Sequence, residues 1–165
     1  MAGHGNDDRT GRTLPHGASG FRGPKGTPRD GPLPVTDLRA FRGALYAAAR
    51  SAGGEAGEVE RQTYPLSFHT AAVVLREDEH VVLCHAHLPW IAFATERRNW
   101  YTGQFGDPPP WASAFAEAGF DVLGREHLLT PLAEVDTSSL SRAEWHNVRT
   151  YGVDTLGGVL FNAWA

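Results

Sequence analysis

Two apolar runs separated by a short charged segment constrain the fold more than any other feature of this chain. Residues 66–76 read LSFHTAAVVLR, residues 77–80 read EDEH, and residues 81–93 read VVLCHAHLPWIAF. Runs rich in β-branched residues that are divided by a short polar segment are typical of a β-hairpin. We therefore expect two antiparallel strands joined by a turn centred on Asp78 and Glu79.

The register of this hairpin decides which titratable side chains share a face. A turn centred on those two residues pairs Ala72 with His85. Side chains alternate between the two faces of a strand, so His85 and His87 would lie on one face and His69 and Cys84 on the other. A loop of odd length would instead bring His69 to the face of His85 and His87. Both arrangements stay open.

Three helices are expected around the hairpin. The first carries an apolar stripe with helical spacing, formed by Leu38, Phe41, Leu45 and Ala48. The second opens with three prolines, which the first turn of a helix tolerates. The third starts with a capping box, a Ser followed three residues later by a Glu. The expected N-caps are Thr36, Asp107 and Ser141, and the glycines expected to end the helices are Gly53, Gly119 and Gly152.

The remaining strands are shorter. We expect them over residues 120–123 and 128–135, with a last strand over residues 159–164. The last segment has large apolar side chains at both odd and even positions, which is typical of a strand covered on both faces. The element order predicts a single α+β domain over residues 35–165. Its sheet should be largely antiparallel, with about three helices packed on it and the C-terminal strand within it.

Residues 1–34 have a different composition. They hold eight Gly and five Pro, with Leu14, Phe21 and Leu33 as the large apolar residues after Met1. Such a segment buries too little surface to offset the chain entropy lost on ordering. We expect a disordered Gly/Pro-rich N-terminal arm. The alternative is a weakly basic arm for a partner.

Charge and cysteine content exclude several protein classes. The arm holds five basic and three acidic residues; of the chain's 15 basic and 19 acidic residues, this leaves 10 and 16 in residues 35–165, a net charge of −6. We expect no nucleic-acid partner, because phosphate contacts need Lys and Arg. A single cysteine allows no intramolecular disulfide, and no run approaches the roughly 20 apolar residues that span a bilayer. We expect a soluble, cytoplasmic protein with no membrane contact and no signal peptide. Its arginine, alanine and glycine bias is typical of a GC-rich bacterial genome, and its oligomeric state stays unknown.

The loop over residues 96–107, ERRNWYTGQFGD, is the best candidate binding segment. Arg, Trp and Tyr are enriched at interface hot spots, and loops carry binding residues more often than the scaffold does. In the alternative interpretation, the loop aromatics fold back over the sheet and leave only the arginines exposed. The candidate binding residues are Arg97, Arg98, Trp100, Tyr101 and Phe105.

The hairpin histidines and cysteine suggest two further sites. His85 and His87 would place two imidazoles about 7 Å apart on one face, where zinc or iron needs at least one more ligand. The possible donors Asp121, Glu126, His127 and His146 have no diagnostic spacing. The sequence therefore predicts no cofactor, with zinc or iron as the alternative. Cys84 and His69 could act as nucleophile and base, or Cys84 could be inert core.

Several motifs of known chemistry are absent. The chain has no P-loop, no dinucleotide fingerprint, no His-Glu-x-x-His, no Cys-x-x-Cys and no Gly-x-Ser-x-Gly. We therefore expect a small binding protein, an immunity-type or accessory module that contacts a protein partner through the loop over residues 96–107. The alternative is a small enzyme, metal-dependent or not, with its site around His85 and His87.

Overall fold

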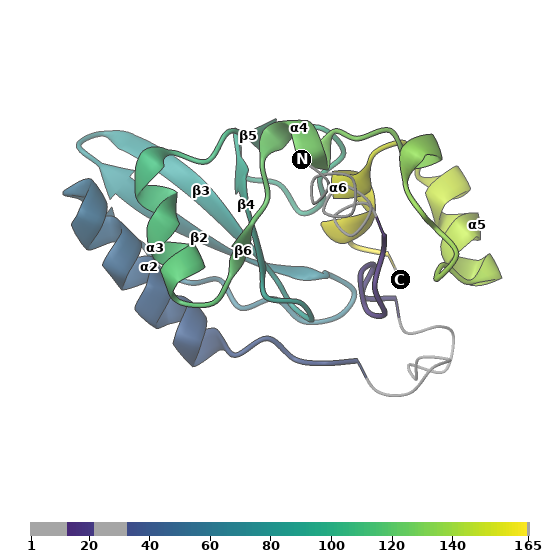
Figure 1. Cartoon of the computed structure of the whole chain (residues 1–165), viewed down its shortest axis with the longest axis horizontal. Coiled ribbons are helices and arrows are strands. Elements are labelled where there is room, and N and C mark those ends of the chain that lie inside the picture. The colour runs from purple at the N-terminus through teal and green to yellow at the C-terminus, as the bar shows by residue number, and fades with distance from the viewer. Residues whose placement is uncertain (1–12, 22–32, 165) are drawn as a thin grey trace, which may run out of the picture.

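One mixed sheet forms the centre of the molecule. The computed structural model describes residues 13–21 and 33–164, and within them six strands follow the order β1-β2-β3-β4-β5, with β6 beside β4. The β4–β6 pair is parallel and the other pairs are antiparallel, so the expected α+β class with a largely antiparallel sheet is confirmed (Figure 1). The strands are β1 (Glu55–Ala56), β2 (Phe68–Leu75), β3 (Asp78–His85), β4 (Trp90–Ala94), β5 (Phe105–Gly106) and β6 (Asp121–Val122).

The expected hairpin is β2–β3, but its register differs from the prediction. Leu75 pairs with Asp78, so the turn consists of Arg76 and Glu77, and Phe68 instead of Ala72 pairs with His85. The turn forms earlier because Arg76 adopts a left-handed conformation with φ of 58°, which closes a two-residue loop.

Of the two arrangements that the sequence left open, the structure has the one in which His69 shares a face with Cys84 and not with His85. His69 pairs directly with Cys84, so their side chains share one face, and His85 lies on the other. The register moved by an even number of residues, which leaves every side chain on the same face.

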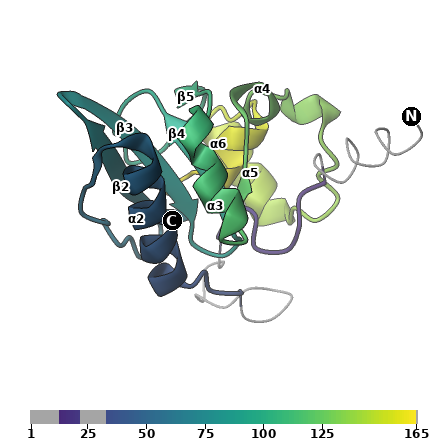
Figure 2. The ribbon, with the colours of Figure 1, turned by 60° about the vertical axis from the view of Figure 1, so that its left-hand side comes forward.

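Helices α2 (Leu38–Ala52) and α3 (Ser113–Glu117) cover one face of the sheet (Figure 2). The predicted stripe of α2 is confirmed, since Phe41, Leu45 and Ala48 are buried against the sheet residues of that face. The N-cap is Asp37 and not Thr36, because the Asp37 carboxylate accepts hydrogen bonds from the backbone N–H groups of residues 39 and 40. Asp107 caps no helix either: a 3₁₀ turn, η1 (Pro110–Ala112), comes first, and its N-cap Pro109 makes no side-chain hydrogen bond.

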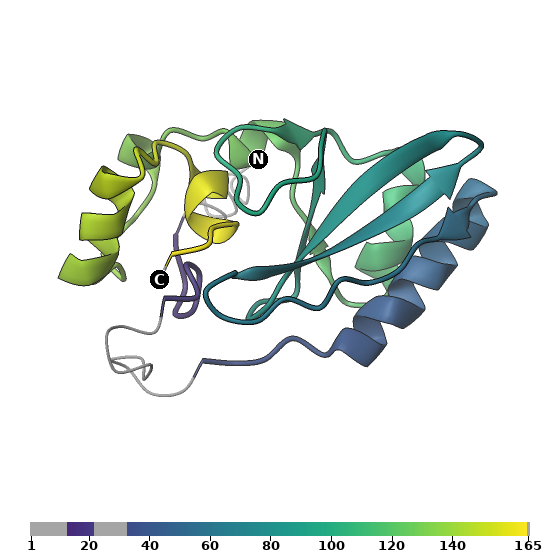
Figure 3. The same ribbon diagram turned by 180° about the vertical axis from the view of Figure 1, so that it is seen from behind.

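The opposite face is covered by shorter and less regular segments. They are α4 (Arg125–Leu128), the 3₁₀ turn η2 (Leu132–Glu134), α5 (Arg142–Thr150) and α6 (Leu156–Leu160), with α5 and α6 at one end of the molecule (Figure 3). The predicted capping box of α5 is present: the Ser141 hydroxyl accepts from the Glu144 N–H, and the Glu144 carboxylate accepts from the Ser141 N–H. The strand predicted over residues 128–135 is wrong, because α4 ends at Leu128 and η2 occupies Leu132–Glu134.

The predicted C-terminal strand is also wrong. Residues 156–160 form α6, whose N-terminus is capped by the Thr155 hydroxyl. Gly157 lets this helix approach β5 closely, since a Cβ there would lie 2.4 Å from Cε2 of Phe105. The segment is buried on all sides, and a continuous apolar run does not distinguish a buried strand from a buried helix.

Residues 13–21, called here the 13–21 segment, pack on this second face. Leu14 and Ala18 are buried, and the backbone N–H of Leu14 donates to the carbonyl of Asp136 at 3.2 Å. For this part of residues 1–34, the expectation of a disordered arm is wrong, because Leu14 and Ala18 are buried by the core and the N–H groups of Leu14, Ala18 and Gly20 are hydrogen-bonded. Residues 1–12 and 22–32 lie outside the described residues. Within the described residues, no helix has the length and apolar character needed to cross a bilayer.

Candidate functional site

The loop over residues 96–107 divides into a buried and an exposed part. Tyr101 and Phe105 are buried, whereas Trp100 keeps 38% of its surface exposed. Tyr101 packs edge-on against Phe68 of β2, with ring centroids 5.5 Å apart. Two of the five candidate binding residues, Tyr101 and Phe105, therefore belong to the core, where a partner does not reach them.

Tyr101 fixes the shape of this loop. Its hydroxyl donates to the carbonyl of Glu96 at 2.8 Å and accepts from the N–H of Arg98 at 2.9 Å. Its own N–H donates to the carbonyl of Phe161, also at 2.9 Å. Burial raises the pKa of Tyr101, so its phenol keeps the proton that it donates. The loop is thus attached at its start to the second-face core.

The two candidate arginines have different surroundings. Arg97 Nε lies 2.6 Å from a carboxylate oxygen of Glu79, and Arg97 Nη1 lies 3.0 Å from one of Glu60. These bonds join the loop to the start of β3 and to the segment before β2. Arg98 makes one looser contact, 3.5 Å from Glu96, and its side chain is 41% exposed. Arg98 is therefore the candidate arginine that is more readily available to a partner.

Trp100 lies against Tyr151, the residue that follows α5. The two rings meet edge to face with centroids 5.8 Å apart, and Tyr151 is 39% exposed. We call these two residues the Trp100–Tyr151 patch. The sequence did not indicate Tyr151 as a neighbour of the loop, because nothing in it brings residue 151 near residue 100.

His85 is enclosed, and both of its ring nitrogens have partners. Nδ1 accepts from the backbone N–H groups of His87 and Leu88, each at 3.1 Å. The proton of the neutral ring is therefore on Nε2, which lies 2.7 Å from the carbonyl of Ala18 in the 13–21 segment and donates to it. Burial lowers the pKa of His85 to about 3, so the ring stays neutral.

His87 lies just beyond β3, and its Nδ1 is 2.8 Å from the carbonyl of Pro34. Its ring meets that of His85 edge to face, with centroids 5.8 Å apart. In the part of the chain that the structure describes, no three His, Cys, Asp or Glu side chains are grouped to hold a metal ion. A metal at His85 would have to displace the hydrogen bonds that both of its nitrogens already make.

Cys84 and His69 face each other across the β2–β3 pair on the α2 face. Cys84 is buried, and burial raises the pKa of its thiol to about 12. Thiol nucleophiles act as thiolates, and a thiol with so high a pKa stays protonated at neutral pH. The pair therefore lacks the electrostatic arrangement of a cysteine nucleophile and its base.

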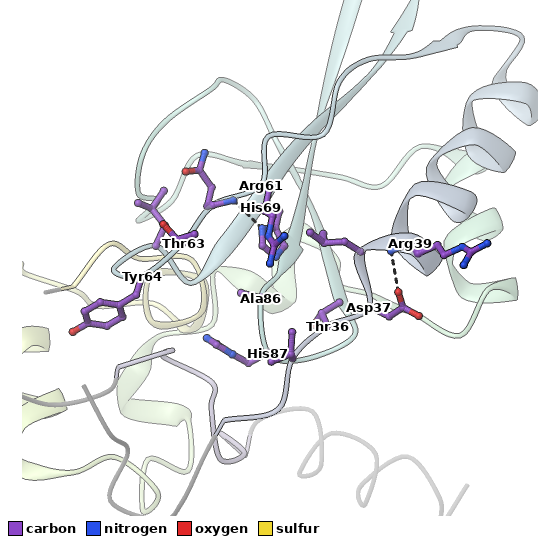
Figure 4. Close-up of a pocket in the computed structure, with 13 residues that line it drawn as sticks. Thr36, Asp37, Arg39, Arg61, Thr63, Tyr64, His69, Ala86 and His87 are labelled. Atoms are coloured by element: carbon purple, nitrogen blue, oxygen red, sulfur yellow. Dashed lines mark hydrogen bonds between the residues drawn. The ribbon is translucent and has the colours of Figure 1, made fainter. Parts of the chain in front are cut away.

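A cavity of about 660 Å³ opens beside His69, called here the His69 cavity. It lies between the segment before β2, the N-terminus of α2 and the end of β3, and Figure 4 shows the His69 ring near its centre. The ring Nδ1 accepts from the backbone N–H of Gln62 at 3.0 Å. Sequence reasoning missed this cavity, because its walls come from three segments with no shared motif. Its lining includes Val35, Asp37, Leu38, Arg61, Leu66 and His87.

Comparisons of the chain with protein families, with curated protein sequences and with solved structures each found no match.

Proposed function

We propose that this protein is a small binding module, of the immunity or accessory type, that contacts a protein partner through the Trp100–Tyr151 patch. The observation that carries the proposal is the edge-to-face contact of two aromatic rings that both stay more than a third exposed. Trp and Tyr are among the residues that contribute most at protein interfaces. Exposed aromatic rings that gather at one place favour a docking surface over scattered surface residues.

The loop that carries Trp100 supports this proposal because it is held in place. Tyr101 attaches the loop backbone to the core through its hydroxyl and its N–H, and Arg97 joins it to Glu79 and Glu60. A binding surface that is ordered before it meets its partner loses less conformational entropy on binding.

The charge of Arg98 indicates which chemical groups the partner surface would carry. Arg98 precedes Trp100 by two residues, and within the described residues its one ion pair is the exposed contact with Glu96. Exposed ion pairs of this kind are worth about 1 kcal/mol or less, so a partner carboxylate can replace Glu96 at little cost. We infer a partner surface that offers an apolar side chain to the aromatic rings and an acidic group to Arg98.

The test is a capture experiment with the full chain as bait and three variants. Trp100→Ala combined with Tyr151→Ala should weaken binding about thirtyfold or more, the loss expected when a hot spot of about 2 kcal/mol is removed. Arg98→Glu should weaken it as well, through repulsion from the acidic group. Tyr46→Ala is the matched control, because Tyr46 is 63% exposed on α2, which covers the other face of the sheet.

Proteins retained by the parent and by Tyr46→Ala, but not by the patch variants, would support the proposal once a purified partner shows the same affinities by calorimetry. Equal recovery with all variants, or no protein specific to the parent, would contradict it. Circular dichroism of each variant checks that the fold is retained.

A further inference from the structure

The His69 cavity contains a buried hydrogen-bond donor. His69 is 5% exposed, and its Nδ1 is occupied by the hydrogen bond from Gln62. Since an accepting Nδ1 carries no hydrogen, the neutral ring has its hydrogen on Nε2. Burial, the largest cause, together with the charges of Arg61 and neighbouring groups, lowers the pKa of His69 to about 4, so the ring is neutral at pH 7.

Two arginines lie close enough to this donor for their charges to act on His69. Arg61 lines the cavity, and Arg42 on α2 is close enough for its charge to act on His69. In the described part of the chain, neither arginine has an acidic side chain within salt-bridge distance. A neutral N–H donor beside cations without acidic partners favours an anion, which would lose little by leaving water for this site.

The N-terminus of α2 also borders the cavity, but it is already satisfied. The Asp37 carboxylate accepts from the N–H groups of Arg39 and Ala40 at 2.9 and 3.2 Å. Figure 4 shows the Arg39 side chain directed away from His69. An anion in the cavity would therefore contact Arg61 and His69, and not the helix end.

The cavity also has an apolar wall. Val35, Leu38 and Leu66 line it, and Val35 is 80% exposed. Ligand pockets of about 300–1,000 Å³ typically combine apolar walls with a few polar groups that orient the ligand. At about 660 Å³, this cavity has room for a compact molecule larger than an inorganic ion.

We propose that the His69 cavity binds a small organic anion, a carboxylate or a phosphate monoester with a compact apolar body. The anionic group would accept from Arg61 and from Nε2–H of His69, and the apolar body would pack against Val35 and Leu66. This cavity shares no residue with the Trp100–Tyr151 patch. The proposal of an anion site is therefore independent of the proposed protein partner.

The test titrates the full chain with benzoate, phenyl phosphate and inorganic phosphate, followed by ¹H–¹⁵N NMR. We expect saturable shifts at the amides of Gln62, Thr63 and His69 for at least one aromatic anion, with inorganic phosphate binding at least about tenfold more weakly. Arg61→Ala should weaken binding about tenfold, as expected for loss of a charge-assisted hydrogen bond. Arg50→Ala, at the far end of α2, is the matched control and should leave the affinity unchanged.

His69→Asn separates the two roles of the imidazole. Asn can still accept from Gln62 N–H but lacks the Nε2–H donor, so anion binding should fall while the fold is kept. If this variant fails to fold, Arg61→Ala alone still decides the matter, because Arg61 is exposed. The absence of saturable shifts up to millimolar concentration would overturn the proposal. So would affinities that Arg61→Ala leaves unchanged, or equal binding of inorganic phosphate and phenyl phosphate.

Discussion

The two faces of the sheet are covered by different kinds of structure. On the α2 face, one long helix and one short helix supply a regular apolar layer, in which Phe41 stacks on Phe115 with ring centroids 6.1 Å apart. On the second face, the 13–21 segment, the loop from residue 96, and α4 to α6 meet with little regular structure. Irregular chain leaves more backbone groups to be satisfied, so the second face depends on buried polar side chains.

Asn162 and Ser67 are two buried polar side chains that satisfy backbone groups on the second face. Asn162 Nδ2 donates to the carbonyls of Ser19 and Val159 at 2.8 and 2.6 Å, and its Oδ1 accepts from the N–H of Trp164. The Ser67 hydroxyl donates to the carbonyl of Leu160 at 2.6 Å and accepts from the Asn162 N–H. A polar side chain in a core is stabilising when all its partners are present, and costly when one is lost. The second face should therefore be the more sensitive of the two to removal of single groups.

The largest expected effect tests this contrast directly. Deleting residues 1–20 removes Leu14 from the core and leaves His85 Nε2 and one of the two Asn162 Nδ2 hydrogens without their carbonyl partners. We expect the free energy of unfolding to fall by on the order of 5 kcal/mol, from the lost apolar burial and two unpaired buried donors.

Urea denaturation measures this effect, and deletion of residues 1–12 alone is the control that isolates the 13–21 segment. A chain without residues 1–20 that unfolds at the parental midpoint would show that the segment contributes nothing to the second face.

Lowering the pH should reduce the stability of the fold, because each face of the sheet carries one buried histidine. Burial lowers the pKa of His69 to about 4 and that of His85 to about 3, whereas an unfolded histidine titrates near 6.5. Between these values the unfolded chain binds more protons, so stability falls as the pH falls below about 6.5. From pH 7 to pH 5 each histidine should cost about 2 kcal/mol, and the two together about 4 kcal/mol.

Urea denaturation of the parent at the two pH values checks this loss. His69→Asn and His85→Asn should each remove about half of the pH dependence, because Asn does not titrate. A variant with the parental slope would show that its histidine is not neutral and buried in the native protein.

The smallest expected effects compare one polar anchor from each face. Asn162→Ala leaves buried carbonyls and the Trp164 N–H unpaired, and we expect a loss of about 3 kcal/mol. Asp37→Ala removes two similar bonds to backbone N–H groups, but these are exposed and water can replace the carboxylate. We expect a loss of about 1 kcal/mol there, the usual value for an N-cap. Equal losses in denaturant melts would contradict the contrast between the faces.

The features of the fold that the sequence predicts are those with a local signature. The α2 stripe, the capping box at Ser141 and the presence of the β2–β3 hairpin are each set by neighbours in sequence. The hairpin register was missed because it depends on the backbone conformation of Arg76, a residue type with no strong turn preference. The helix α6 was missed because full burial removes the periodicity that distinguishes helix from strand.

The candidate sites were harder to predict than the fold. Trp100 and Arg98 could be selected as binding residues by their type. The same criterion also selected the aromatic residues Tyr101 and Phe105, which belong to the core. The neighbours of each site come from distant segments, as Tyr151 does for Trp100 and Arg61 for the N-terminus of α2. No local pattern encodes such neighbours.

The hydrogen bond from Asn162 to Ser19 joins residues 143 positions apart in the chain. Closing so long a loop adds only modestly to the equilibrium cost, because loop entropy grows with the logarithm of length. It bears more on the order of folding, since contacts between distant segments form slowly. Helix α2 and the β2–β3 hairpin can form from contacts between near neighbours in sequence. The second face can form only after the segments that contain Ser19 and Asn162 have come together. We expect a kinetic intermediate, if one accumulates, to have α2 in place and the surface around Phe68 and Phe161 still open to water.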